Sequence, residues 1–340
     1  MAFLMLKLKE ESNSDKMKDN KLPIMELNNI NKEYKLGGGY VFKALADINF
    51  SVKEGEVLTI LGHNGAGKST LIKIIMGFTK PTTGSIKIFG TDTSKMLPKH
   101  VKAKIGYIPE VVHFYGNLSG IETMEFFGKL NNLYNKKLFE ELLDKVGISG
   151  AANKKVVSYS KGMKQRLAFA VSRIKDPDIY IFDEPTSGMD PSAVNDFISL
   201  VRLINDNGKT ILMTAHILPE IEDISNRICV ILNGKITALG GIPELLEGLG
   251  LPTTINLRFK NGFKFEESWF ENIKNFKLIT DYKFNDKILS ANIKFIETKR
   301  IKLINEIISK YHDDLADMSI KKPGLFEIFS HFSNKKVYND

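Results

Sequence analysis

The residues best suited to chemistry form a glycine-rich loop between a predicted strand over 56–61 and a predicted helix. From Gly62 to Thr70 the sequence reads GHNGAGKST, which fits G-x-x-x-x-G-K-[ST]. Glycines let backbone N–H groups wrap a phosphate, and the N-terminus of the helix adds positive potential. Lys68 is expected to reach the β and γ phosphates, and the Ser69 hydroxyl to bind Mg²⁺. The predicted phosphate-binding residues are Gly62, Asn64, Gly65, Gly67, Lys68, Ser69 and Thr70.

Two carboxylates follow a second apolar strand, which reads IYIF over 179–182. Asp183 stands where a phosphate loop needs a further Mg²⁺ ligand, held directly or through water. Glu184 comes next, and a carboxylate there can lie beside the terminal phosphate and orient or deprotonate water. The pair therefore predicts hydrolysis of a phosphate bond.

Strand-like and helix-like segments alternate from Ile24 to about Gly240, which predicts an α/β domain with a largely parallel sheet. A Gly- and Pro-rich break over 240–252 precedes a segment whose predicted order, β-α-β-β-α-β, is that of a ferredoxin-like unit. We expect an ATPase domain over 24–242 and a C-terminal α+β domain over 253–340. Residues 1–23 are predicted to be a flexible tail, with a short amphipathic helix as the alternative.

Composition excludes several classes of protein. The chain has 340 residues, 43% hydrophobic and 26% charged, which is ordinary for a globular protein and excludes a collagen or a disulfide scaffold. Its single cysteine cannot form an intrachain disulfide, so a reducing compartment fits. No stretch approaches the roughly 18 apolar residues of a membrane span. The net charge of +8 suits nucleic acid, nucleotide or an anionic membrane surface, and does not choose among them.

Six motifs, in order over about 24–240, resemble those of ABC ATPases. The segment SYSKGMKQRL over 158–167 resembles the signature, usually LSGGQ followed by a basic helix, and DEPTSGMD over 183–190 resembles the Walker B end and the D-loop. His216 resembles the switch histidine, and Tyr34 the aromatic that stacks on adenine. Residues 105–110 resemble the strand leading into the Q-loop. The resemblance implies a P-loop ABC ATPase domain with a helical subdomain at about 111–175.

The resemblance also implies a head-to-tail dimer that binds two ATP molecules with Mg²⁺. Each ATP would lie between the phosphate loop of one subunit and the signature of the other, so Ser160, Gly162 and Asp190 would serve the partner's nucleotide. His216 would contact the γ-phosphate and keep Glu184 aligned with water. The implied activity is ATP hydrolysis coupled to transport.

Three positions depart from the family pattern or leave its register open. Glu110 stands where the Q-loop usually has Gln; a carboxylate can still ligate Mg²⁺, but it adds negative charge near the triphosphate. In the signature, Lys161 and Met163 replace Gly and Gln, and Lys161 would either add charge at the partner's nucleotide or be solvated. Tyr40 and Phe42 are alternatives to Tyr34 as the aromatic residue that stacks on adenine, and a triple-glycine loop separates them from Tyr34.

With these departures, the signature and the Q-loop are similar to those of single-domain ATPases that pair with ABC-2-type permeases. Residues 107–123 and 214–221 are further similar to the ATPase of the Nos-type copper-maturation transporter serving nitrous oxide reductase. The resemblance implies a homodimer on the inner face of the cell membrane that energises a separate permease, most readily for export, with no nucleic acid as partner. The Met and aromatic side chains of the helical stretch 119–143 are expected mainly to pack in the core. As an alternative, part of the stretch, with His113, Phe114 and Tyr115, would line a groove that receives a permease helix.

Two other functions compete with this reading. One is a soluble ABC ATPase of translation or DNA repair, which a single phosphate loop and the lack of sustained heptads disfavour. The other is a P-loop kinase, which the signature and Glu184 disfavour. The C-terminal domain is expected to serve dimerisation or capping, with regulation or partner docking as the rival.

Overall fold

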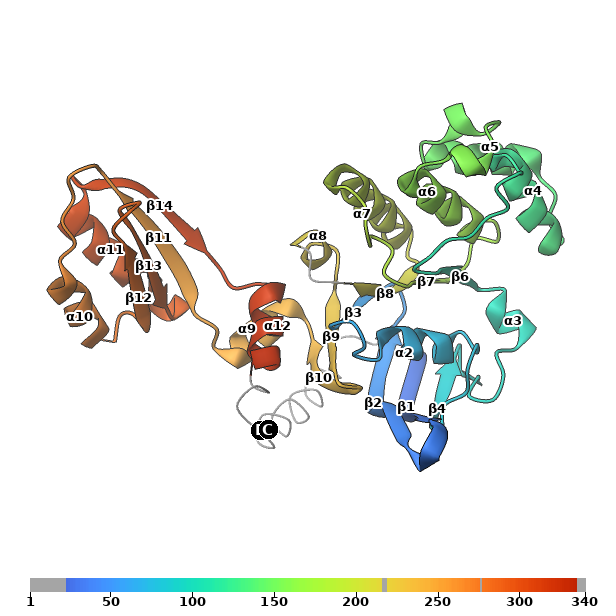
Figure 1. The fold of residues 1–340 in the computed structure, drawn as a ribbon, viewed down its shortest axis with the longest axis horizontal. Coiled ribbons are helices and arrows are strands. Elements are labelled where there is room, and N and C mark those ends of the chain that lie inside the picture. The colour runs from blue at the N-terminus through green and yellow to red at the C-terminus, as the bar shows by residue number, and fades with distance from the viewer. Residues whose placement is uncertain (1–22, 216–218, 276, 335–340) are drawn as a thin grey trace. The chain divides into compact units, whose positions relative to one another are not determined.

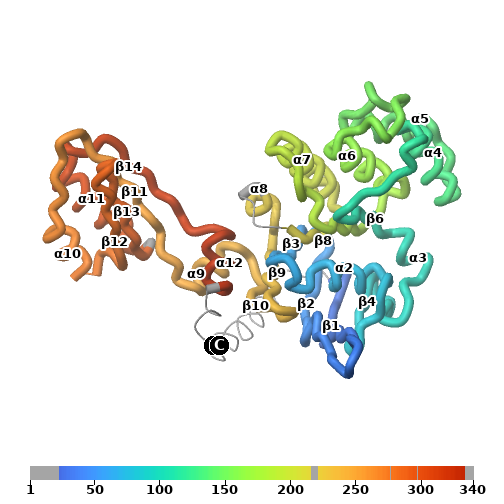
Figure 2. Tube along the Cα trace, viewed as in Figure 1, coloured from blue at the N-terminus to red at the C-terminus, as the bar shows by residue number. Residues whose placement is uncertain are grey.

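The computed structural model describes residues 23–215, 219–275 and 277–334, which form two compact units. One unit holds the described residues before 216 together with Asp223–Leu239, and the other holds α8 (Pro219–Glu222) and the described residues from Gly240 onward. Figure 2 traces both units by residue number. The predicted tail lies outside the described residues except for Pro23, and His216 lies outside them as well.

The first unit is built on a six-stranded sheet, drawn in Figure 1. Its strand order is β10 (Lys235–Gly240), β9 (Arg227–Leu232), β3 (Val57–Leu61), β8 (Thr210–Ala215), β7 (Ile179–Phe182) and β6 (Ile105–Ile108). The five strands from β9 to β6 pair in parallel. Every residue of β3, β7 and β8 is buried, as expected of parallel strands covered on both faces. The predicted parallel sheet is therefore confirmed.

A second, four-stranded antiparallel sheet was only partly predicted from the sequence. It has the order β2 (Val41–Lys53), β1 (Pro23–Lys35), β4 (Thr83–Ile88) and β5 (Thr91–Asp92). Of these strands, the pattern indicated β4. The strands β1 and β2 contain register shifts, which interrupt the simple alternation of apolar and polar residues by which a strand is recognised. Their buried side chains join α2 (Lys68–Ile75) in one core.

Helices of the first unit begin at recognisable caps. The predicted helical stretch 119–143 forms α4 (Gly120–Leu130) and α5 (Lys136–Lys145), and Ser119 and Glu122 make a capping box at the start of α4. Ser160 caps α6 (Lys161–Ser172), and Asp190 caps α7 (Pro191–Asp206), each with its side-chain oxygen. The short α3 (Lys99–Lys102) precedes β6. Helices α4, α5 and α6 gather beyond β6 and β7 in Figure 1.

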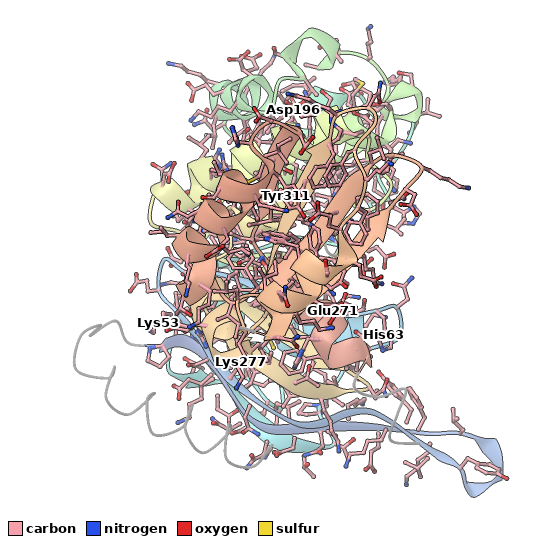
Figure 3. All side chains as sticks on the ribbon, turned by 90° about the vertical axis from the view of Figure 1, so that its left-hand side faces the viewer. Lys53, His63, Asp196, Glu271, Lys277 and Tyr311 are labelled. Carbon is pink, nitrogen blue, oxygen red and sulfur yellow. The ribbon has the colours of Figure 1, made fainter. Side chains whose placement is uncertain are left out.

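The second unit contains the predicted β-α-β-β-α-β order. Its elements are α9 (Ile242–Leu249), β11 (Thr253–Phe259), α10 (Glu267–Asn275), β12 (Asp281–Asn285), β13 (Ser290–Phe295), α11 (Arg300–Tyr311), β14 (Leu315–Lys321) and α12 (Leu325–Asn334). The antiparallel sheet has the order β12-β13-β11-β14, in which the third strand separates the first from the second. This is the split arrangement of a ferredoxin-like unit. Tyr311, labelled in Figure 3, is buried in its aromatic core.

Among the described residues, no helix is both long and apolar enough to cross a membrane.

Candidate functional site

The glycine-rich loop lies between β3 and α2, as its sequence predicts. Gly67 has a φ of +110°, which only glycine adopts readily, and Gly65 has a φ of +80°. A side chain at Gly62 would place its Cβ 2.5 Å from the Ile231 carbonyl oxygen, so backbone packing forbids one. The loop therefore holds backbone N–H groups at the start of α2, in the arrangement that binds phosphate.

Lys68 is directed into this loop. Its ammonium donates to the carbonyl oxygen of Gly62 at 2.7 Å and to that of His63 at 3.3 Å, and it lies 3.1 Å from Oε1 of Glu184. The Lys68 side chain is 3% exposed. Burial with three oxygen partners holds the positive charge at a fixed position beside the loop. The structure thus brings together Lys68 and Glu184, two residues that were chosen from separate motifs.

Asp183 and Glu184 follow β7 at the carboxyl end of the parallel sheet. Both are buried, with 5% and 8% exposure. Burial raises the pKa of Asp183 above its ordinary value, although a hydrogen bond from Thr214 opposes this. Glu184 has a φ of +46°, an uncommon backbone state for a residue with a side chain, and such strain is concentrated at functional sites.

Sequence reasoning missed Thr214, which bridges the carboxylate of Asp183 and the backbone of Glu184. Its Oγ1 donates to Oδ1 of Asp183 at 2.7 Å and accepts from the backbone N–H of Glu184 at 2.8 Å. Thr214 lies on β8, which pairs in parallel with β7, so a polar side chain at this end of β8 could have been expected beside Asp183. Thr214 therefore holds the carboxylate of Asp183 and the backbone of Glu184 in place.

Glu110 lies near the same acids, after β6. Burial, and then the negative charges of Asp183 and Glu110, raise the pKa of Tyr107 to about 12. Glu110 is exposed, and the N–H of Asp183 donates to the carbonyl oxygen of Ile108 at 2.9 Å. The predicted metal-binding side chains Ser69, Asp183 and Glu110 offer only oxygen atoms, the donors that Mg²⁺ prefers.

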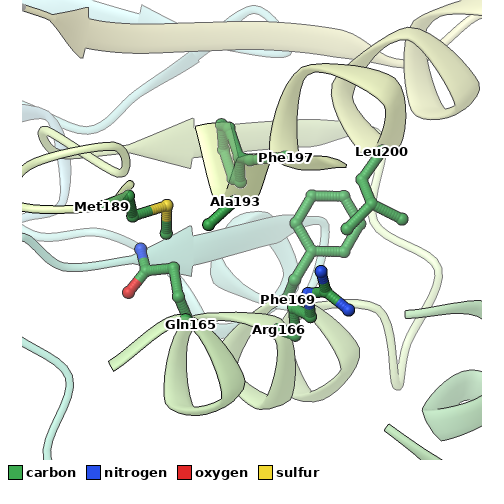
Figure 4. Close-up of a pocket in the computed structure, with 8 residues that line it drawn as sticks. Gln165, Arg166, Phe169, Met189, Ala193, Phe197 and Leu200 are labelled. Carbon is green, nitrogen blue, oxygen red and sulfur yellow. The ribbon is translucent and has the colours of Figure 1, made fainter. Parts of the chain in front are cut away.

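The predicted signature and D-loop lie side by side in one subunit (Figure 4). Ser160 Oγ accepts from the N–H of Met163, and Asp190 Oδ1 accepts from the N–H of Ala193. Phe169 of α6 meets Phe197 of α7 edge to face. Ser160, Gly162 and Asp190 therefore sit at the beginnings of two adjacent helices, where N–H groups can face an anion.

Tyr34 lies near the end of β1, opposite Phe42 of β2. The side chain of Tyr34 is 37% exposed, and the Lys32 ammonium lies 4.9 Å from the centre of its ring. Phe42 and Tyr40 are also exposed, so the stacking role of Tyr34 stays a prediction. The structure describes neither the backbone nor the side chain of His216, whose predicted role also stays a prediction.

The chain is similar to known ATP-binding subunits. A sequence profile of the family described as ABC transporter matches residues 45–187. The linearmycin resistance ATP-binding protein LnrL of Bacillus subtilis (strain 168) is 30% identical over 319 residues, which cover 92% of this chain and 99% of that protein. The bacitracin transport ATP-binding protein BcrA of Bacillus licheniformis is 30% identical, covering 87% of this chain and 83% of that protein.

Solved structures agree with this likeness. The fold matches a dimeric bacterial ABC transporter cassette with a TM-score of 0.58 and 27% identity, over 64% of this chain and 98% of that one. A second structure of that cassette is described as a post-hydrolysis state bound to ADP and Pi, again with a TM-score of 0.58 and 27% identity over the same shares. The chain therefore belongs to the ABC transporter family, in which it is an ATP-binding, ATP-hydrolysing subunit.

Proposed function

We propose that two copies of this chain close on two ATP molecules with Mg²⁺ and thereby drive a separate ABC-2-type membrane permease. The observation that carries the proposal is the meeting of Lys68 and Glu184 in one buried site, with the ammonium and carboxylate 3.1 Å apart. Lys68 would hold the β and γ phosphates, and the loop N–H groups would hold the remaining phosphate oxygens.

Glu184 is proposed to act as the general base. Its carboxylate is buried and its backbone is fixed by the hydrogen bond to Thr214, so it can hold one water in line with the terminal phosphate. Ser69 and Asp183, with Glu110 nearby, would hold Mg²⁺. The bound metal would neutralise the negative charge of the phosphates. His216 is proposed to keep Glu184 and the water aligned.

The second half of each site would come from the partner subunit. Ser160 and Gly162 lie at the N-terminus of α6, and Asp190 lies in front of α7. The phosphate loop of the same chain lies before α2, and neither α6 nor α7 begins with such a loop. This supports the proposed contact of Ser160, Gly162 and Asp190 with the partner's nucleotide. The solved cassette relative is described as dimeric, in keeping with this arrangement.

The permease is proposed to bind beside the Q-loop and α4. Val111 and Tyr115 expose large apolar side chains there, at 59% and 60%. Tyr115 packs edge to face on Phe126 of α4, which holds its ring in place. A permease helix could cover this surface with its own apolar side chains. The export direction and the Nos-type subgroup rest on motif resemblance alone.

Co-purification from membranes tests the proposal. The full-length chain should purify with a multi-span membrane protein, and Tyr115→Ser should reduce the recovered permease by about tenfold because the aromatic side chain that the permease would cover is lost. Tyr134→Ser is the matched control, since Tyr134 is 65% exposed in the connection between α4 and α5, and it should leave recovery unchanged. Recovery with ribosomes in place of a membrane protein would contradict the transporter function.

A further inference from the structure

Helices α6 and α7 begin side by side. A Cβ on Gly162, in the first turn of α6, would lie 3.7 Å from the Cβ of Ala193, in the first turn of α7. Further along, the ring of Phe169 on α6 meets the ring of Phe197 on α7, with the ring centres 5.9 Å apart. A small cavity of about 10 Å³ lies in this seam, drawn in Figure 4. Because the contacts advance from the N-terminus of both helices, the signature turn, 160–163, lies next to the end of the predicted D-loop.

This arrangement brings two positive helix ends together. Paired N-termini concentrate positive potential, which suits an anion but also makes the two ends repel each other. The carboxylate of Asp190 reduces this repulsion at α7, whereas Ser160, the cap of α6, is uncharged. Side-chain contacts further along the helices are therefore needed to keep the two ends level.

A charged pair bridges the helices at such a place. Nη2 of Arg166 on α6 donates to Oδ2 of Asp196 on α7, so the contact is both a hydrogen bond and an ion pair. Each of the two residues lies six positions after the cap of its helix, which is about 9 Å along the axis. A bond at equal depth resists sliding of one helix along the other. Because the two side chains are 31% and 51% exposed, the pair adds little to the stability of the fold.

We infer that Arg166 is a positioning residue that acts through Asp196 to hold the signature turn level with the D-loop. Ser160 and Asp190 would then meet the partner's nucleotide together. This consequence for hydrolysis rests on the proposed ATP-bound dimer, whereas the ion pair does not. The rival role for Arg166 is a direct contact with the partner subunit, for which Asp196 would not be needed.

A cross-link measures the position of the two helices without nucleotide. Gly162→Cys with Ala193→Cys would place two thiols on Cβ atoms about 3.7 Å apart, a separation that suits a disulfide. The natural Cys229 is fully buried and does not compete. Oxidation of this full-length, nucleotide-free variant should form the bond, and adding Arg166→Met should slow its formation by about threefold, the effect of one exposed ion pair. Arg166→Lys should restore the rate, and Lys164→Met, which removes a cation of α6 but leaves the ion pair, should not change it.

Steady-state ATP hydrolysis by the protein with its natural residues at 162 and 193 supplies the second measurement. Arg166→Met and Asp196→Asn should each lower kcat by about threefold with KM for ATP nearly unchanged, because the phosphate loop is not altered. The double variant should be no slower than either single variant, since both remove the same interaction.

Two results overturn the inference. One is an unchanged cross-linking rate in Arg166→Met, even if kcat falls. The other is a double variant in which the two losses of kcat multiply, because Arg166 and Asp196 then act independently. If the unsubstituted protein does not hydrolyse ATP, the proposed function fails while the cross-linking rate still decides whether Arg166 positions the helices.

Discussion

The Lys68 ammonium and the Glu184 carboxylate lie 3.1 Å apart, and both side chains are buried. Lys68 comes from the loop after β3, and Glu184 comes from the end of β7, with β8 between these two strands in the sheet. A buried ion pair is costly to form unless each group has further partners. Lys68 has two backbone carbonyl oxygens, and the backbone of Glu184 is fixed by Thr214. The site is thus arranged so that the proposed base already lies beside the residue expected to hold the phosphates.

Thr214→Val should lower the stability of the fold and weaken the binding of Mg²⁺. The substitution removes the donor to Asp183 and the acceptor for the N–H of Glu184, and leaves two buried polar groups without that partner. We expect the free energy of unfolding to fall by about 1–3 kcal/mol. The Mg²⁺ concentration at half-maximal hydrolysis should rise, because the pKa of Asp183, already raised by burial, loses the hydrogen bond that lowers it.

Thr59→Val is the matched control for Thr214. Thr59 is also buried on a strand of the same sheet, and its hydroxyl pairs with Ser225 at 2.7 Å. Denaturant unfolding should show a similar loss of stability, but the Mg²⁺ dependence should not change. Equal Mg²⁺ dependence in both variants would contradict the role given to Thr214.

Glu122→Gln should reduce stability in a pH-dependent way. The hydrogen bond from the Ser119 N–H, and then the one from Lys155, lower the pKa of Glu122 from 4.5 to about 2. A carboxyl whose pKa is lowered by folding stabilises the fold at pH values above its ordinary pKa of 4.5. This contribution is lost as the pH falls from 4.5 towards about 2.

Unfolding curves over that range measure the effect. The difference between the unsubstituted protein and Glu122→Gln should be largest above pH 4.5 and should shrink as the pH approaches 2. Glu125→Gln, which lies three residues further along α4 and outside the capping box, should show no such trend. A constant difference across the range would mean that the charge of Glu122 does not act through its lowered pKa.

Gly324→Ala should loosen the start of α12 in the second unit. A Cβ there would lie 2.6 Å from Oε2 of Glu222, the oxygen that accepts from the N–H of Leu325 at 3.0 Å. Moving this carboxylate removes a cap, and the loss of stability should be about 0.5–2 kcal/mol by thermal or denaturant unfolding. Gly248→Ala in α9, where no atom lies within 4 Å, should be neutral or stabilising.

The sequence predicted those parts of the fold that depend on residues within a single segment. The β-α-β-β-α-β order of the second unit was predicted, because apolar spacing and end residues are local features of the sequence. The sheet of β1 and β2 was largely missed, since its register shifts and the left-handed Asn29 and Asp47 interrupt the alternation. Pairing between distant strands depends on tertiary contacts that no single segment contains.

The residues of the candidate site can likewise be divided into those that local motifs predicted and those that were missed. The loop from Gly62 to Thr70 and the acids after β7 were predicted, because their motifs combine glycine turns with fixed charged residues. The bridge made by Thr214 was not predicted, since it depends on which neighbour lies opposite in space. A threonine that ends a strand has many possible partners, and only the parallel pairing of β7 and β8 selects Asp183.

Hydrolysis by Glu184→Gln tests the central claim most directly. The amide keeps the shape of the side chain but cannot take a proton from water, so ATP turnover should fall by about a hundredfold or more. ATP should still bind, and size-exclusion chromatography with Mg²⁺ and ATP should show a dimer that accumulates. Glu54→Gln, an exposed acid before β3, should leave turnover unchanged. Undiminished hydrolysis in Glu184→Gln would remove Glu184 from the mechanism and contradict the account.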